Sequence, residues 1–369
     1  MKKFFAKGLC ILLSVTMVLG LSACGNNTAN NTSDGQYTES ETASITVQDM
    51  AGDTVTLDSR ADEIICTWPS GTQLMITLGM SDLLVGVPED SKELAWAMHI
   101  APEVKNIRSC SNEESVESLL QIGADLVITT EADVARDLRS KGVNAITVNY
   151  YSVEEMKQAI TLLGNIIPEE YSQKCADFLT YLDNQINLVA SSLDGKIDKK
   201  VSLYYIHGNN NKGLYKTAGG NTMNEAWANY AYTDFATSDL LTASETVVNA
   251  EAILNKNPDM IVIGGRYQSI LKEELLNTPE WNDVNACVNN RIYLAPLGVS
   301  PFDRFGAEFA LMIPWVASQA YPDLFSYDIK KEVKDFYQTF SDYTLTDDEV
   351  NYIVNGLKPD GTPEIENAE

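Results

Sequence analysis

The sequence predicts an α/β fold of two lobes with mainly parallel sheets, joined by a single long rigid helix. Short, continuous apolar runs alternate with helical stretches, a pattern typical of parallel sheets covered on both faces. These runs form two series, one on each side of a long amphipathic stretch. The chain has 369 residues, 44% of them hydrophobic and 21% charged, which suits a globular protein of about two domains.

The first 43 residues carry the pattern of an export signal followed by a tether. Three lysines among the first seven residues precede an apolar stretch that is shorter than the about 20 residues a spanning helix needs. Residues 1–23 resemble a bacterial lipoprotein signal peptide, which implies a diacylated N-terminal Cys24; the alternative is an ordinary secretory signal with an incidental cysteine. Residues 24–43 lack apolar periodicity beyond that cysteine and are expected to be a flexible tether. We therefore expect an extracytoplasmic protein, lipid-anchored to the cell membrane.

Residues 44–167 are expected to form the N-terminal α/β lobe. Two β-favouring segments, 45–47 and 55–57, flank a turn with Asp and Gly and so predict a hairpin. The apolar runs that follow are predicted to be buried strands with helices between them. These runs are residues 64–66, 83–87, 126–128 and 145–148.

Residues 168–194 are predicted to be the connecting helix and residues 195–358 the C-terminal α/β lobe. Apolar residues recur in steps of four and three from Ile167 to Leu193, which places them on one helix face. The apolar runs of the second lobe are residues 201–206, 260–263 and 291–294. Residues 359–369 are rich in Pro, Gly and acidic side chains and are expected to be a flexible tail.

Composition excludes several classes of function. The chain has 52 acidic and 26 basic residues, a formal charge of −26, which opposes binding to nucleic acid or to anionic lipid through a basic patch. Two histidines are too few for a His-rich metal cage. The sequence has no Gly-x-Gly-x-x-Gly, Walker-type phosphate loop, His-Glu-x-x-His or Gly-x-Ser-x-Gly motif. These observations disfavour an enzyme.

An internal repeat supports the two lobes. Glu117 precedes Asp125 by eight residues, and Glu251 precedes Asp259 by eight residues, each aspartate lying just before a strand. Each glutamate also comes two residues after a residue that can cap a helix. Favourable placement in the first turn of a helix would by itself account for both glutamates.

Segments spread along the chain carry a family resemblance: residues 77–87, 117–125, 257–262, 289–293, and 315–317 with 321–325. From residue 45 to about residue 356 the chain resembles the periplasmic binding proteins that feed ABC importers of iron–siderophores, cobalamin and haem. The resemblance implies two lobes flanking a ligand cleft, no catalytic activity, no cofactor, and an ABC permease dimer with its ATPase as partner. We expect a monomer. The Gly-Gly-Asn usual after the first helix of the second lobe is replaced by Asn-Tyr-Ala-Tyr at residues 229–232, while residues 219–221 have those letters earlier in the chain.

The resemblance also gives the repeated glutamates a role. In this family a glutamate of each lobe docks onto arginines of the membrane permease. By position these glutamates would be Glu117 and Glu251.

The ligand-binding residues are expected at the carboxyl ends of the strands, where open α/β sheets bind ligands. Two arginines could meet an anionic ligand, although each could instead form a structural ion pair. Four aromatic residues could line a flat cavity or cap the core, and one histidine could reach a metal or simply pack. The candidates are Trp68, Tyr150, Tyr151, His207, Arg266, Tyr267 and Arg304.

Apart from Cys24, the cysteines beyond the signal segment show no metal-binding spacing. They are Cys66, Cys110, Cys175 and Cys287. Four cysteines allow three complete disulfide pairings, and the sequence does not choose among them. No metal site is expected.

These observations together predict a lipid-anchored protein that captures a scarce metal chelate and passes it to a permease. An iron(III)–siderophore is the first choice of cargo, because the two arginines would complement an anionic chelate. A corrinoid such as cobalamin comes second, haem third and a bare oxyanion such as molybdate fourth. The alternatives from other classes are an enzyme built on this fold and a surface adhesin or sensor without a permease.

Overall fold

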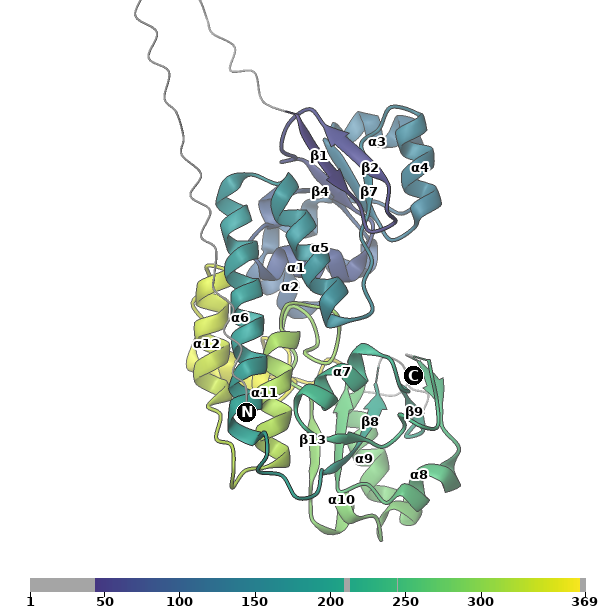
Figure 1. The fold of residues 1–369 in the computed structure, drawn as a ribbon, viewed down its shortest axis with the longest axis vertical. Coiled ribbons are helices and arrows are strands. Elements are labelled where there is room, and N and C mark those ends of the chain that lie inside the picture. The colour runs from purple at the N-terminus through teal and green to yellow at the C-terminus, as the bar shows by residue number, and fades with distance from the viewer. Residues whose placement is uncertain (1–43, 209–212, 244, 366–369) are drawn as a thin grey trace, which may run out of the picture. The chain divides into compact units, whose positions relative to one another are not determined.

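The computed structural model describes residues 44–208, 213–243 and 245–365. The predicted signal peptide, Cys24 and the tether lie outside the described residues. Within the described part of the chain, no helix combines the length and apolar character needed to cross a membrane. Figure 1 shows an α/β lobe at each end of one long helix, and the predicted fold class is confirmed.

A short hairpin opens the N-terminal lobe, as predicted. Strands β1 (Ile45–Gln48) and β2 (Thr54–Leu57) pair antiparallel. The buried carboxylate of Asp49 accepts hydrogen bonds from the backbone N–H groups of Ala51 at 3.0 Å and Asp53 at 2.9 Å. The same carboxylate accepts one from the N–H of Thr147 at 3.0 Å. One aspartate therefore both shapes the turn and joins the hairpin to the sheet.

The N-terminal lobe is built on a five-stranded parallel sheet in the order β5-β4-β3-β6-β7. Its strands are β3 (Ile64–Cys66), β4 (Leu84–Val87), β5 (Arg108–Ser109), β6 (Leu126–Thr129) and β7 (Ala145–Thr147). Every residue of β3, β6 and β7 is buried, as continuous apolar runs predict. Helices cover both faces: α1 (Pro69–Thr77), α2 (Ala95–Ile100), α3 (Val116–Ile122), α4 (Ala132–Ser140) and α5 (Val153–Ile166), with 3-10 turns η1 (Ser81–Leu83), η2 (Glu89–Lys92) and η3 (Pro102–Asn106).

Helix α6 (Glu169–Leu193) connects the lobes and has 25 residues, about 38 Å at 1.5 Å per residue. Pro168 directly precedes it, and Gly195 with a φ of +69° follows it. Its buried stripe is Cys175, Phe178, Leu182, Gln185, Val189 and Leu193. This stripe follows the predicted spacing and packs against α5 and α11.

The C-terminal lobe contains a four-stranded parallel sheet in the order β10-β8-β12-β13. Its strands are β8 (Ser202–His207), β10 (Asp234–Phe235), β12 (Met260–Gly264) and β13 (Ile292–Leu294), and β9 (Lys216–Thr217) pairs with β11 (Thr246–Val247) in a small antiparallel ribbon. Helices α7 (Met223–Tyr230), α8 (Ala250–Lys256), α9 (Gln268–Asn277) and α10 (Asn285–Val288), with the 3-10 turn η4 (Pro279–Trp281), complete the lobe.

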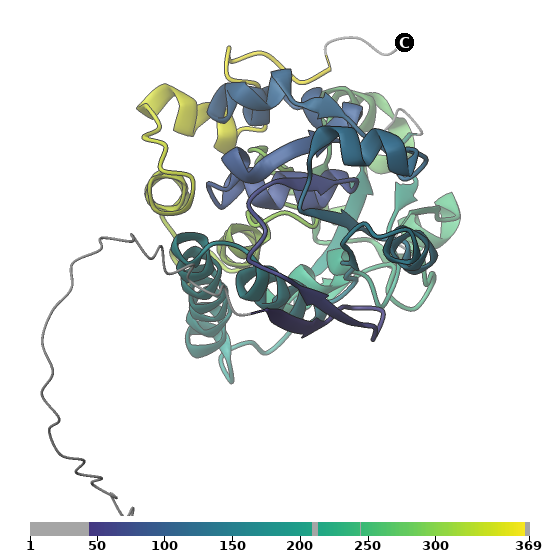
Figure 2. The same cartoon turned by 90° about the horizontal axis from the view of Figure 1, so that it is seen from above.

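The last three helices return to the N-terminal half of the chain. They are α11 (Phe309–Ala320), α12 (Ile329–Phe340) and α13 (Asp347–Val354). The rings of Phe336 and Phe340 in α12 pack edge-on against Phe178 of α6. The Ser341 hydroxyl donates to the Thr77 carbonyl at 2.7 Å. Figure 2 shows the yellow C-terminal helices beside the blue helices of the N-terminal lobe.

The end of the described chain differs from the flexible tail predicted from residue 359. Leu357 pairs with Pro363 in an isolated antiparallel bridge, and the Lys358 N–H donates to the Thr362 carbonyl at 2.8 Å. Hydrogen-bonded structure therefore extends into the segment after residue 358, whose composition predicted a flexible tail.

The cysteines Cys66, Cys110 and Cys175 are buried and Cys287 is half-buried, and all four are free thiols in the structure. Burial is the main cause that raises the pKa of each thiol. A raised pKa keeps the thiols protonated at neutral pH, so they behave as small apolar side chains.

Candidate functional site

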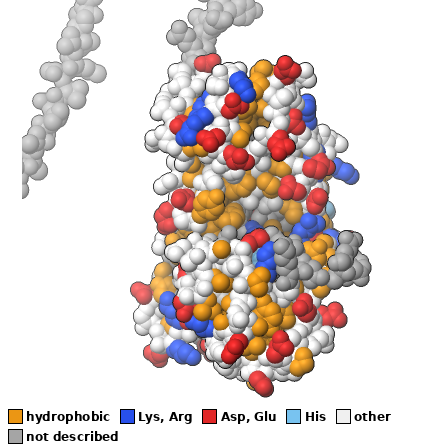
Figure 3. Space-filling model, turned by 90° about the vertical axis from the view of Figure 1, so that its right-hand side faces the viewer, with side chains coloured by type: hydrophobic (Ala, Val, Ile, Leu, Met, Phe, Trp, Pro, Cys, Tyr) orange, Lys and Arg blue, Asp and Glu red, His pale blue; other side chains and the backbone are white. Residues whose placement is uncertain are grey.

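A pocket of about 390 Å³ lies between the lobes. Its walls come from the segments that follow β3, β4, β12 and β13, at the carboxyl ends of the strands, where the sequence places the ligand cleft. The lining residues are Pro69, Ser70, Gln73, Asp90, Glu93, Leu94, Glu245, Arg266, Pro301, Arg304 and Phe305. Hydrophobic side chains gather at the level between the lobes on the face drawn in Figure 3.

Two of the predicted ligand-binding residues, Arg266 and Arg304, line this pocket. His207 lies directly behind Arg304 and is fully buried, with its side chain 0% exposed. The other four candidates, all aromatic, are not among the lining residues: Trp68, Tyr150, Tyr151 and Tyr267.

The aromatic candidates fall into three different environments. Tyr150 is buried, its hydroxyl donates to the Phe305 carbonyl, and burial raises its pKa far above the ordinary range. Trp68 packs edge-on against Tyr150 with ring centroids 5.0 Å apart. Tyr151 is 64% exposed, and Tyr267 packs against the second lobe's core. Tyr150 thus joins the two halves of the chain at the edge of the pocket.

Arg304 is held by a buried polar network. Its guanidinium donates to the ring of His207, and its Nε lies 3.4 Å from the Asp303 carboxylate. That carboxylate also accepts a hydrogen bond from the buried hydroxyl of Tyr205. Gly264 leaves room for the network, because a Cβ there would lie 2.2 Å from Asp303 Oδ2. The guanidinium is therefore fixed before any ligand arrives.

The histidine in this network is neutral at physiological pH. Burial, and then the positive charges of Arg304 and Lys216, lower the pKa of His207 to about 2. The Glu245 carboxylate lies 2.9 Å from His207 Nε2 and 2.9 Å from Lys216 Nζ. Glu245 therefore places a half-exposed negative charge beside the Arg304 guanidinium at the pocket wall.

Arg266 joins the two lobes across the pocket. Its Nη1 lies 3.3 Å from the Glu93 carboxylate of the N-terminal lobe. Its Nε lies 3.4 Å from the Glu364 carboxylate near the end of the described chain. The pocket wall thus holds one fixed guanidinium, at Arg304, and one with an ion pair that an anionic ligand could replace.

The pocket carries groups for recognising charge and shape. Guanidinium groups bind carboxylate and other anionic oxygens through paired N–H donors. Within the described residues, no group of three or more His, Cys, Asp and Glu side chains could hold a metal ion.

The sequence-predicted glutamates Glu117 and Glu251 occupy matching positions on the two lobes. Both are exposed, in the first turns of α3 and α8. The predicted caps are present: the Ser115 hydroxyl accepts from the Ser118 N–H at 3.1 Å, and the Asn249 side chain accepts from the Ala252 N–H at 3.1 Å. Figure 1 shows α3 and α8 on the same side, and Figure 3 shows Asp and Glu side chains on both lobes of that face.

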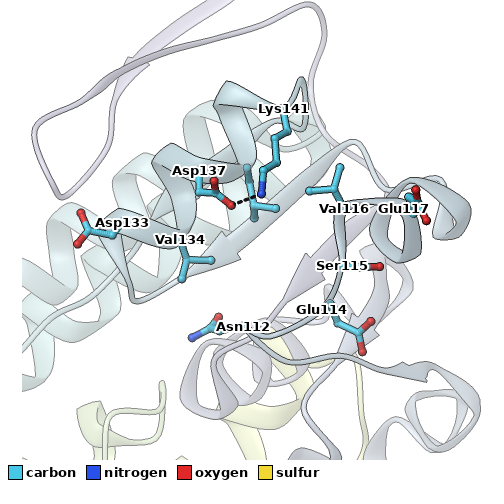
Figure 4. A pocket seen from close by; sticks show the side chains of 10 residues that line it. Asn112, Glu114, Ser115, Val116, Glu117, Asp133, Val134, Asp137 and Lys141 are labelled. Carbon is cyan, nitrogen blue, oxygen red and sulfur yellow. Dashed lines mark hydrogen bonds and ion pairs between the residues drawn. The ribbon is translucent and has the colours of Figure 1, made fainter.

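A second, more open hollow of about 600 Å³ adjoins Glu117. Figure 4 shows Asp133 and Asp137 on one side of it and Glu114 on the other. Lys141 is bound to Asp137 at 2.7 Å, so acidic groups dominate the rim.

Comparisons with known proteins give the family of the chain and support its fold. A family model described as periplasmic binding protein matches residues 64–297, more than half of the chain. The chain belongs to the periplasmic binding protein family. An uncharacterized ABC transporter substrate-binding lipoprotein of Bacillus subtilis, YvrC, is 25% identical over 340 residues, which cover 88% of this chain and 99% of that protein.

Two solved structures share the fold of this member of the family. A periplasmic solute binding protein of Veillonella parvula has a TM-score of 0.75 and 24% identity, covering 86% of this chain and 99% of its own. The molybdate periplasmic binding protein MolA of Haemophilus influenzae, bound to molybdate, has a TM-score of 0.69 and 20% identity, covering 82% of this chain and 99% of its own.

Sequence reasoning missed the acidic half of the pocket. Glu93 follows β4 in a short turn, and Glu245 lies in a connection without regular structure. Neither lies in a motif, so only the position of Glu93 after a strand could have drawn attention to it. Phe305 could have been named as a pocket residue from the sequence, because it directly follows the predicted Arg304.

Proposed function

We propose that this chain is the substrate-binding lipoprotein of an ABC importer and that its cargo is an iron(III)–siderophore-type chelate. The observation that carries the proposal is the pair of guanidinium groups, Arg266 and Arg304, in one pocket between two α/β lobes. Membership of the periplasmic binding protein family supports the transport role. The likeness to a substrate-binding lipoprotein supports the acyl anchor proposed for Cys24, outside the cytoplasm.

The two guanidinium groups support an anionic, multidentate cargo, which has to compete with the pocket's own carboxylates, Asp90, Glu93 and Glu245. Arg304 is fixed by buried neighbours, so little side-chain freedom is lost when it binds. Arg266 already pairs with Glu93, so a ligand gains from that arginine only by offering more negative charge than one carboxylate. A ferric chelate with several anionic oxygens meets this condition. The chain makes and breaks no covalent bond in this account.

The structure favours closure of small amplitude around the cargo. Helix α6 spans the junction as one continuous element, and α11 packs along it. The C-terminal helices add the contact between Ser341 and Thr77. A hinge of this kind has few backbone torsions free to absorb a large rotation.

The loaded protein is proposed to dock as a monomer onto the permease dimer, which works with its ATPase. Glu117 and Glu251 would meet arginines of the permease, one from each half. Their exposure, their matching helical positions and the shared side of α3 and α8 support this assignment.

Calorimetric titration of the purified protein with a ferric tris-catecholate tests the proposed site. Arg266→Ala and Arg304→Gln should each weaken binding by more than about 1.5 kcal/mol, the range for hydrogen bonds to a charged group. Arg108→Ala is the matched control, because Arg108 is exposed and lies outside the pocket. An unchanged dissociation constant in both pocket variants would remove the two arginines from the binding site.

A further inference from the structure

The end of the chain forms a short strap, residues 356–365, which we name the C-terminal strap. The Leu357–Pro363 bridge and the Lys358–Thr362 hydrogen bond close it into a tight turn. Bonds of this kind are typical of a closed turn.

The C-terminal strap contacts both lobes. The indole N–H of Trp96 in α2 donates to the Leu357 carbonyl at 2.8 Å. The buried side chain of Gln268, at the start of α9, donates to the Gly356 carbonyl at 3.2 Å. Gly356 has a φ of +67°, and a Cβ there would lie 2.0 Å from Gln268 Nε2. Glycine at this position therefore permits the close approach to the second lobe.

The C-terminal strap also reaches the pocket through Glu364. Its carboxylate, with the side chain only 5% exposed, lies 3.4 Å from Arg266 Nε. That Nε is buried and makes no hydrogen bond within the described part of the chain, so the nearby carboxylate is its electrostatic partner. Burial raises the pKa of Glu364, and the Arg266 charge opposes this rise. One guanidinium is thus shared between Glu364 on one side and Glu93 in the pocket on the other.

We propose that Glu364 is a positioning residue for the binding cleft, holding the Arg266 guanidinium at the pocket wall through the C-terminal strap. The cargo takes the place of Glu93 at Nη1, while Glu364 keeps its contact with Nε. Arginine is a flexible side chain, and a partner that fixes it in advance lowers the entropy lost on binding. The inference rests on the proposed role of Arg266 in binding cargo.

The direct test observes the Arg266 side chain without any ligand. In ¹⁵N-labelled protein, Arg266→Lys identifies the Nε–H resonance of Arg266 by its disappearance. Glu364→Gln removes the charge while keeping the shape, and should shift this resonance and speed its exchange with water. Asp360→Asn is the matched control, because Asp360 lies in the same turn and contacts Thr362 rather than Arg266.

The second readout is affinity for a ferric tris-catecholate. Glu364→Gln should weaken binding at least about fivefold, at the low end of coupling between separate sites. Asp360→Asn should not change it. Glu364→Asp, which keeps the charge, should restore part of the affinity, a rescue that a purely structural role for the strap does not predict.

The outcomes separate this inference from the proposed cargo. An Arg266 Nε–H resonance that is unchanged in Glu364→Gln overturns the positioning role, whatever the protein binds. The positioning role is also overturned if Glu364→Gln binds the chelate as tightly as wild type while Arg266→Ala binds it more weakly. If wild type fails to bind the chelate, the cargo proposal fails, and the Arg266 resonance alone decides whether Glu364 positions this arginine.

Discussion

Replacing Glu308 by glutamine is expected to remove a pH-dependent loss of stability from this protein. Glu308 is fully buried just before α11, at the junction of the two halves. Its carboxylate accepts hydrogen bonds from the Ser300 N–H at 3.0 Å and the Tyr337 hydroxyl at 2.8 Å. The Thr77 hydroxyl of α1 lies 3.4 Å away. Burial outweighs these donors and raises the pKa of Glu308 to about 7.

The sign and size of the effect follow from linkage. A carboxyl group with a raised pKa in the folded state binds its proton more tightly there than in the unfolded chain. Its contribution to stability is therefore complete below pH 4.5, its ordinary pKa, and is lost as the pH rises through about 7. The difference between these two pKa values corresponds to about 3 kcal/mol. Glutamine stays neutral and can keep the same hydrogen-bond partners.

Urea unfolding from pH 4.5 to 8.5 measures this directly. The free energy of unfolding should be similar for wild type and Glu308→Gln at pH 4.5, and the variant should be more stable by about 3 kcal/mol at pH 8.5. The exposed Glu169 provides the control: the free energy of unfolding of Glu169→Gln should change with pH as it does for wild type. If the free energy of unfolding changed with pH in the same way for Glu308→Gln and wild type, the pKa of Glu308 would not be raised in the folded protein.

Three further predictions concern docking, the pocket wall and pH. Glu117→Ala combined with Glu251→Ala should abolish cargo uptake in cells and leave cargo affinity unaltered in calorimetry. Gly264→Ala should destabilise the protein by about 1–3 kcal/mol in denaturant titrations, because its Cβ would meet the Asp303 carboxylate at 2.2 Å. Because the pKa of His207 is lowered to about 2, titration of this side chain should produce no step in cargo affinity between pH 5 and 8, checked by calorimetry across that range.

Each of these three predictions can be contradicted by a specific result. Uptake at the wild-type rate would remove the docking role, and Glu169→Ala with Glu170→Ala is the control, since both glutamates are exposed on the first turn of α6. An unchanged free energy of unfolding for Gly264→Ala would mean that the Asp303 side chain has room to move. An affinity step near pH 6.5 that disappears in His207→Gln would show that this histidine titrates with an ordinary pKa.

The parts of the fold that sequence predicted are those fixed by local pattern. The continuous apolar runs at β3, β6 and β12 could be recognised because each strand is buried on both faces. Helix α6 could be recognised from the four-and-three spacing of its apolar residues. Arg266 could be named as a candidate because it follows a strand end, where the fold class places a ligand, and in the structure it lines the pocket between the lobes.

The parts that sequence did not predict depend on contacts between distant residues. Glu93 and Glu364 lie far from Arg266 in the chain, and nothing in their neighbours indicates that they meet its guanidinium. Tyr150 is an aromatic residue near a strand end, as expected of a ligand-binding residue, yet its hydroxyl donates a hydrogen bond to the Phe305 carbonyl. Local composition predicted a tail from residue 359, yet Gln268 and Trp96 hold the carbonyls of Gly356 and Leu357 at the start of the C-terminal strap, and Arg266 lies beside Glu364 near its end.

The most direct test of the proposed function is a thermal-shift screen of the purified protein against ferric siderophores, cobalamins, haem and molybdate. A ligand at 100 times its dissociation constant stabilises the folded protein by about 2.7 kcal/mol, which is readily detected. The proposed function predicts a shift with ferric siderophores that is reduced in Arg266→Ala and Arg304→Gln. A shift with another ligand alone, or with none of them, would contradict the assignment of a ferric chelate as cargo.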